Sequence, residues 1–230
     1  MEVLITRALE DGLEFQQDLS AKGIIAHVLP LHHVEHLNVA IEGEFQALIL
    51  TSKQGASALK NYPQLSSLPV YCVGDETARV AAENGFKNTH SAHGDVHDLL
   101  DLIVRECAHD IHFLYLSGED VRHELSQILK DHGFLCDQKV VYKIHDRIDL
   151  SPDEQALLHS KQITHIPLFS PKSAERLVRC MKDYHVDCSS KICVCLSHDI
   201  ATVAKDVKWH TIDVVLHPSR ESMTEYFNGR

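Results

Sequence analysis

Short apolar runs alternate with amphipathic stretches along most of the chain. The apolar runs have the length and composition of buried strands, and they lie at 3–6, 24–29, 47–51, 70–73, 88–92, 166–169 and 211–216. Between them, apolar positions suited to helices occur at 9–21, 53–59, 96–106, 171–181 and 219–227. Strands that alternate with helices of this length predict an α/β protein built on doubly wound parallel sheets, with helices on both faces.

The stretch 70–86 shows this pattern most clearly as strand, tight turn and helix. After the strand, Gly74 makes the turn and Thr77 lies in the first helical turn, where free backbone N–H groups need oxygen partners. The pair Asn84-Gly85 ends the helix, because glycine tolerates the left-handed conformation of a helix C-cap. A turn of this kind presents N–H groups to an anion above the sheet.

Several stretches recur, which indicates an internal duplication. The stretch 194–209 repeats 71–86, although Ser197 replaces Gly74 and Ile200 replaces Thr77. The first helix has Leu13, Phe15 and Leu19 as its apolar residues and ends at Gly23. The stretch 113–141 repeats this helix and its neighbouring strands, and the repeated helix ends at Gly133. Two topologies fit these repeats. Either the two copies fold consecutively, or 37–140 form one domain and both termini lie in the other.

Composition and charge narrow the class of protein. The chain has 230 residues, 44% of them hydrophobic and 24% charged, which is ordinary for a globular protein. No apolar run is long enough to span a membrane, and no secretory signal is visible at the N-terminus. Seven cysteines without a C-x-x-C motif favour a reducing cytoplasm. A net charge of −11 disfavours nonspecific binding to nucleic acid or anionic membranes.

Small polar residues follow most of the predicted strands. The strand ends read Thr6-Arg7, Ser52-Lys53, Gly74-Asp75, Ser117-Gly118, Ser170-Pro171 and Ser197-His198. Ligands of open parallel sheets bind at the carboxyl ends of the strands, where Ser and Gly let backbone N–H groups approach. Taken singly, each of these residues is better explained as a helix cap. Their repetition at nearly every strand end favours a ligand-binding site.

Six short motifs, in order, make the chain similar to the uroporphyrinogen-III synthase family over essentially its whole length. They are VLITR at the N-terminus, ALILTSKQGASAL at 47–59, VGDETARVAAENGF at 73–86, FLYLSGEDVRHEL at 113–125, VVY at 140–142 and FSPKSAERL at 169–177. The stretch 193–204 departs from the family, because Ser197 and Ile200 stand where many relatives have a glycine-threonine turn.

The resemblance implies the second topology, with one domain formed by 1–33 and 147–230, another by 37–140, and linker strands at 31–36 and 141–147. It places the active site in a cleft between the domains. It also implies the reaction, a hydro-lyase cyclisation of hydroxymethylbilane to uroporphyrinogen III with inversion of ring D and loss of water. No cofactor or metal is expected, and we expect a cytoplasmic monomer whose partner is the small-molecule substrate.

The resemblance also assigns candidate residues. Tyr142 matches the family's linker tyrosine and is the candidate general acid for departure of the hydroxyl group. Without the resemblance, a strand aromatic that packs the core explains it better. The candidate residues for binding the eight substrate carboxylates are Arg7, Ser52, Lys53, Gly74, Thr77, Ser117, Gly118, Ser170, Lys172 and Ser197.

Other functions stay open at this point. The main alternative is a two-lobed binding protein without catalytic activity, against which Tyr142 and the polar strand ends count. A nucleotide-dependent transferase is disfavoured, because the sequence lacks G-x-G-x-x-G and P-loop motifs. Eighteen histidines, with His32, His33 and His36 close in sequence, raise the question of a metal site. Spacing alone shows no convergent ligand set.

Overall fold

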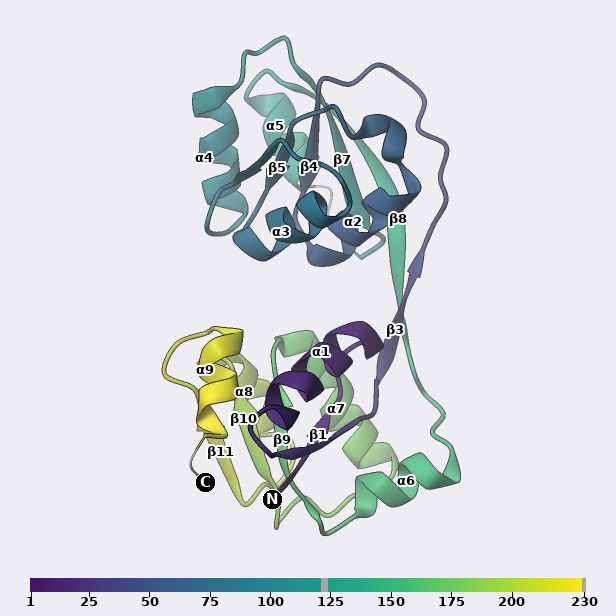
Figure 1. Cartoon of the computed structure of the whole chain (residues 1–230), viewed down its shortest axis with the longest axis vertical. Coiled ribbons are helices and arrows are strands. Elements are labelled where there is room, and N and C mark those ends of the chain that lie inside the picture. The colour runs from purple at the N-terminus through teal and green to yellow at the C-terminus, as the bar shows by residue number, and fades with distance from the viewer. Residues whose placement is uncertain (121–123, 229–230) are drawn as a thin grey trace. The chain divides into compact units, whose positions relative to one another are not determined.

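The chain divides into two compact units. The computed structural model describes residues 1–120 and 124–228. Unit 1 comprises Met1–His33 and His145–Arg230, and unit 2 comprises Val34–Ile144. Residues 121–123 of the fourth motif and the last two residues of the chain lie outside the described residues. The chain therefore passes between the units twice, and both of its ends belong to unit 1 (Figure 1).

Unit 1 contains a five-stranded parallel sheet with the order β11-β10-β9-β1-β2. Its strands are β1 (Glu2–Ile5), β2 (Ile25–Val28), β9 (Ile163–Leu168), β10 (Ile192–Cys195) and β11 (Thr211–Val214). Its helices are α1 (Leu9–Ser20), α6 (Pro152–His159), α7 (Pro171–Asp183), α8 (His198–Ala204) and α9 (Arg220–Tyr226).

Alternate residues of strand β1 point to opposite faces of this sheet, as the two-residue period of a strand requires. Val3 and Ile5 pack in one core cluster with Phe15 of α1 and Phe227 beside α9. Leu4 packs in the other, which contains the buried residues of α7 and α8. Helices thus cover both faces.

Unit 2 contains most of a six-stranded sheet with the order β3-β8-β7-β4-β5-β6, of which β3 begins and β8 ends in unit 1. Its strands are β3 (His32–His36), β4 (Ala47–Leu50), β5 (Val70–Cys72), β6 (Thr89–Ser91), β7 (His112–Gly118) and β8 (Leu135–Asp146). Its helical segments are α2 (Lys53–Ala58), the two 3-10 turns η1 (Leu59–Asn61) and η2 (Pro63–Leu65), α3 (Asp75–Glu83), α4 (Val96–Glu106) and α5 (Glu124–Asp131). Leu48 and Leu50 face the core under α2 and α3, whereas Ala47 and Ile49 face the core under α4 and α5.

The predicted fold class is therefore confirmed: the protein is a mixed α/β protein with two parallel-dominated sheets. The two glycines that follow the repeated helices have the same backbone conformation in both copies. Gly23 follows α1 with a φ of 74°, and Gly133 follows α5 with a φ of 86°. Both are left-handed conformations, which glycine adopts without steric cost.

Three sequence expectations need correction. Of the three apolar residues predicted in the first helix, Phe15 and Leu19 are buried, whereas Leu13 is 43% exposed. The short extended segment after 140 is the second half of one long strand, β8, which pairs with β7 from Leu135 onwards. Helix α6 was not predicted, although Ser151 and Glu154 form a capping box at its start.

Candidate active site

The carboxyl ends of four strands lie at one edge of the unit 2 sheet, because β8, β7, β4 and β5 are parallel neighbours. Ligands of open parallel sheets bind at this edge. The sequence-predicted residues that the structure brings to it are Ser52, Lys53, Gly74, Thr77, Ser117, Gly118 and Tyr142. They come from the ends of β4, β5 and β7, the starts of α2 and α3, and the middle of β8.

Tyr142 is held between Gly118 and Ser52. Tyr142 belongs to β8, which pairs with β7. A shift in register places Tyr142 opposite Gly118, the last residue of β7. A Cβ atom at Gly118 would lie 2.6 Å from Cζ of the Tyr142 ring, which means that the ring needs a glycine here. The phenol oxygen also lies 2.9 Å from Oγ of Ser52. The ring is only 6% exposed, so its position is well determined by packing.

The Tyr142 phenol stays protonated at neutral pH. Burial raises its pKa above the ordinary value of 10, the hydrogen bond with Ser52 lowers it, and the nearby charge of Asp120 raises it. The net shift is upward. A buried, protonated phenol at the carboxyl edge of a sheet can donate a proton to a bound substrate.

Ser52 also begins helix α2, since its Oγ accepts a hydrogen bond from the backbone N–H of Gly55 at 3.0 Å. Two of the other predicted serines cap helices of unit 1 in the same way. Oγ of Ser170 accepts from Ser173 N at 3.2 Å, and Oγ of Ser197 accepts from Ile200 N at 3.5 Å. Capping is therefore part of the role of all three, and their hydroxyl groups already have protein partners.

Helix α3 begins differently. Its N-cap is Gly74, and within the described part of the chain no side chain caps it. Thr77 lies in its first turn and is 5% exposed, and the structure shows no hydrogen bond to its hydroxyl group among the described residues. Free N–H groups and a hydroxyl at a helix N-terminus suit an anion such as a carboxylate. This turn is thus better prepared for a ligand than the corresponding turn of α8.

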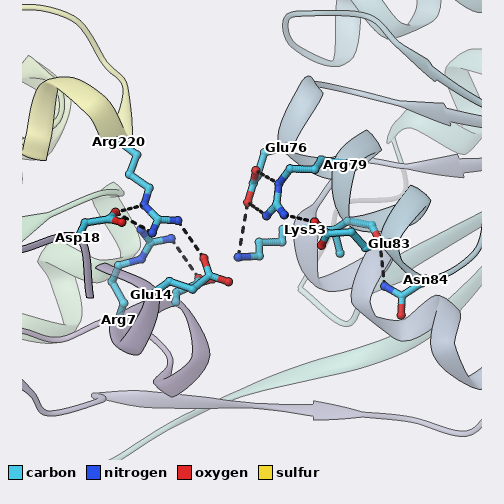
Figure 2. Close-up of polar contacts among 11 residues, drawn as sticks. Arg7, Glu14, Asp18, Lys53, Glu76, Arg79, Glu83, Asn84 and Arg220 are labelled. Atoms are coloured by element: carbon cyan, nitrogen blue, oxygen red, sulfur yellow. Dashed lines mark hydrogen bonds and ion pairs between the residues drawn. The ribbon is translucent and has the colours of Figure 1, made fainter. Parts of the chain in front are cut away.

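Lys53, the first residue of α2, joins an ion-pair network of α3 residues (Figure 2). Its Nζ lies 3.5 Å from Oε1 of Glu76. Arg79 donates two hydrogen bonds to the same carboxylate, Nε to Oε2 at 2.9 Å and Nη2 to Oε1 at 2.8 Å, and it also contacts Glu83. The network places a lysine beside the open start of α3.

Two further contacts at this edge were not visible from the sequence. The hydroxyl groups of Thr51 and Tyr115 lie 2.8 Å apart. Ser117 is 1% exposed, and its Oγ accepts a hydrogen bond from Nε2 of Gln138 at 2.8 Å. Ser117 thus faces the sheet interior, where it links β7 to β8. No short-range sequence signal pairs residues this far apart.

Unit 1 has its own set of predicted residues at the carboxyl edge of its sheet. Arg7 follows β1, forms an ion pair with Asp11 at 3.0 Å, and its guanidinium carbon lies 4.3 Å from the centre of the Phe169 ring. Ser170 and Lys172 begin α7, and Ser197 begins α8. Arg220 of α9 binds Asp18 and Glu14 of α1 (Figure 2), which joins two helices on the same face.

The histidines do not assemble into a metal centre in the described part of the chain: no group of three or more His, Cys, Asp or Glu side chains there is arranged to hold a metal ion. Burial, together with the charge of Arg176, lowers the pKa of His32 to about 4. His33 and His145 stack with ring centres 4.9 Å apart. Cys193 and Cys195 are fully buried on one face of β10, as expected for core residues.

Comparison with known proteins decides the family. A model of the family "Uroporphyrinogen-III synthase HemD" matches residues 14–225. The chain belongs to the uroporphyrinogen-III synthase family. Comparison with curated protein sequences found no match. None of the helices in residues 1–120 and 124–228 is long and apolar enough to cross a membrane.

Solved structures support the assignment at the level of the fold. The chain is similar to uroporphyrinogen-III synthetase from Helicobacter pylori, with a TM-score of 0.69 and 19% identity over 98% of this chain and 97% of that one. It is also similar to a mutant uroporphyrinogen III synthase from the extremely thermophilic bacterium Thermus thermophilus, with a TM-score of 0.54 and 12% identity over 98% and 97% of the two chains. Members of this family are enzymes of haem biosynthesis, and the resemblance seen in the six sequence motifs is confirmed.

Proposed function

We propose that the protein is a hydro-lyase that converts hydroxymethylbilane to uroporphyrinogen III, with loss of water and inversion of ring D. The family assignment supports the reaction. The observation that carries the site is the buried phenol of Tyr142, held 2.9 Å from Ser52 at the carboxyl edge of the unit 2 sheet. We expect the protein to act as a cytoplasmic monomer.

In this proposal Tyr142 is the general acid. The C–O bond of the hydroxymethyl group breaks, the oxygen takes the phenolic proton, and water leaves. Because burial raises the pKa of Tyr142, the proton is present throughout the neutral range. The raised pKa also makes the phenol a weaker acid, so the phenolate that forms needs stabilisation.

Ser52 can supply that stabilisation. The N–H group of Gly55 donates to Oγ of Ser52, and the proton of Ser52 is then available to the phenol oxygen. In this arrangement Ser52 donates to Tyr142 and Tyr142 donates to the departing hydroxyl group. A hydrogen bond to the charged form favours it, which agrees with the lowering effect of Ser52 on the Tyr142 pKa.

Substrate binding in this proposal rests mainly on backbone donors. The protein carries a net charge of −11, so its overall field does not attract a polycarboxylate. The open first turn of α3 offers N–H groups, and the Thr77 hydroxyl adds a donor. Local donors of this kind hold a carboxylate without a net positive charge.

The test compares Tyr142→Phe with wild type in single-turnover conversion of hydroxymethylbilane. The substitution keeps the packed ring and removes the proton donor, so the rate should fall by about 10²–10⁴-fold, the usual worth of general acid catalysis. Tyr115→Phe is the matched control, because it removes another buried hydroxyl group from the adjacent strand. We expect little change in its rate.

Two outcomes would contradict the role of Tyr142. An unchanged rate for Tyr142→Phe would make it a core residue alone. A shift of the product towards the non-inverted isomer at an unchanged rate would make it a group that orients the substrate. The alternative function, binding without catalysis, predicts that wild type binds hydroxymethylbilane but does not accelerate its closure.

A further inference from the structure

Lys53, a candidate substrate-binding residue, is already paired with a carboxylate of the protein itself. Its Nζ lies 3.5 Å from Oε1 of Glu76, and its side chain is 21% exposed. Charge-assisted hydrogen bonds between an ammonium and a carboxylate usually measure about 2.7–2.9 Å. The contact is therefore a long ion pair that a closer anion can replace.

Glu76 has a second and tighter partner. Arg79 binds both of its oxygens, at 2.8 and 2.9 Å, from one turn further along α3. The Arg79 hydrogen bond is the main cause that holds the pKa of Glu76 below its ordinary value. Loss of Lys53 would consequently leave Glu76 ionised and paired with Arg79 (Figure 2).

We propose that Glu76 is a specificity-determining residue that occupies Lys53 until a carboxylate of the substrate takes its place. On binding, the ammonium moves from Glu76 to the substrate carboxylate beside the open start of α3, while Glu76 stays with Arg79. A ligand without a carboxylate at this position cannot replace Glu76 as the partner of Lys53. This inference rests on the proposed function, because it assigns the exchange to the same site.

The test measures KM and kcat for hydroxymethylbilane with Glu76→Gln. The amide keeps a hydrogen-bond acceptor for Arg79 but removes the charge that competes for Lys53. KM should fall by about two- to fivefold, the range that an exposed ion pair supports. The value of kcat should stay unchanged, since Tyr142 and Ser52 are not affected.

Glu83→Gln is the matched control. Glu83 lies on the same helix, pairs with the same Arg79 and is similarly exposed, at 59% against 54% for the Glu76 side chain. No contact between Glu83 and Lys53 occurs in the described residues. If only total charge mattered, both variants would lower KM equally, and that result would overturn the inference.

A double-mutant cycle separates the exchange of Lys53 between Glu76 and the substrate from other effects on KM. Lys53→Met should raise KM, and adding Glu76→Gln to it should cause no further change, because the pair is already broken. An increase in KM for Glu76→Gln alone would show that Glu76 holds Lys53 in place for the substrate, contrary to the exchange. Absence of conversion by wild type would instead contradict the proposed function, so the two failures are distinguishable.

Discussion

Replacing Gly118 by alanine should displace the Tyr142 phenol without removing it. The new Cβ atom would lie 2.6 Å from Cζ, 2.7 Å from Cε2 and 2.8 Å from the hydroxyl oxygen of the ring. Ordinary van der Waals contact begins at 3.4 Å, so the ring must move by about 0.8 Å. The ring is nearly buried, and overpacking of this kind typically costs about 1–3 kcal/mol of unfolding free energy.

The displacement acts on the hydrogen bond to Ser52. Its present length is 2.9 Å, and a shift of the ring by ~0.8 Å away from the new Cβ atom would move the phenol oxygen out of this hydrogen-bond geometry. Misplacing a catalytic group by about 1 Å can cost up to about 10²-fold in rate. We therefore expect Gly118→Ala to lower the single-turnover rate by about 10- to 100-fold, while the protein remains folded.

The assay pairs single-turnover kinetics with urea unfolding. Gly74→Ala is the stability control, because its added Cβ atom meets nothing closer than 4.0 Å and should leave the unfolding midpoint nearly unchanged. The Gly118→Ala/Tyr142→Phe double variant should be almost as active as Tyr142→Phe alone, since Gly118→Ala acts through the same phenol that Tyr142→Phe removes. A wild-type rate for Gly118→Ala, or fully additive losses in the double variant, would refute the reasoning.

Three further predictions follow from single features of the two units. Thr77→Val should raise KM more than Ile200→Val, because only Thr77 brings a hydroxyl group to an uncapped helix start, and equal effects would show that the two turns do not differ. A fragment of residues 34–144 should unfold cooperatively, whereas a fragment of residues 37–140 should be less stable because it lacks the buried Val141 and Tyr142. Urea unfolding followed by circular dichroism would measure the stability of both fragments. The raised pKa of Tyr142 predicts that less than half of its phenol is ionised at pH 10, so the ultraviolet difference spectrum between wild type and Tyr142→Phe should show less tyrosinate there than a tyrosine of ordinary pKa gives.

The sequence predicted most elements of the fold because their patterns are local. Buried strands such as β4 are continuous apolar runs, and helix α4 has its bounds marked by Asp95, which caps it, and by the loss of periodicity after Glu106. Leu13 shows the limit of this reasoning. Its apolar character says nothing about the direction of its side chain once the helix packs through Phe15 and Leu19.

The site was only partly predictable. The residues predicted at strand ends lie together at one edge of each sheet, because parallel topology brings carboxyl ends together. What each residue does there depends on partners that are distant in sequence, such as Ser52 with Tyr142 and Gln138 with Ser117. Three of the serines predicted to bind substrate, Ser52, Ser170 and Ser197, also cap helices. Gly118, predicted to bind substrate at a strand end, also makes room for the Tyr142 ring.

The ratio of product isomers tests the central claim most directly. Hydroxymethylbilane closes without a catalyst to the non-inverted isomer, so purified protein and substrate can be incubated and the two uroporphyrinogens separated by chromatography after oxidation. The account predicts that the inverted isomer, uroporphyrinogen III, dominates and forms faster than spontaneous closure. The non-inverted isomer alone, formed at the spontaneous rate, would contradict it.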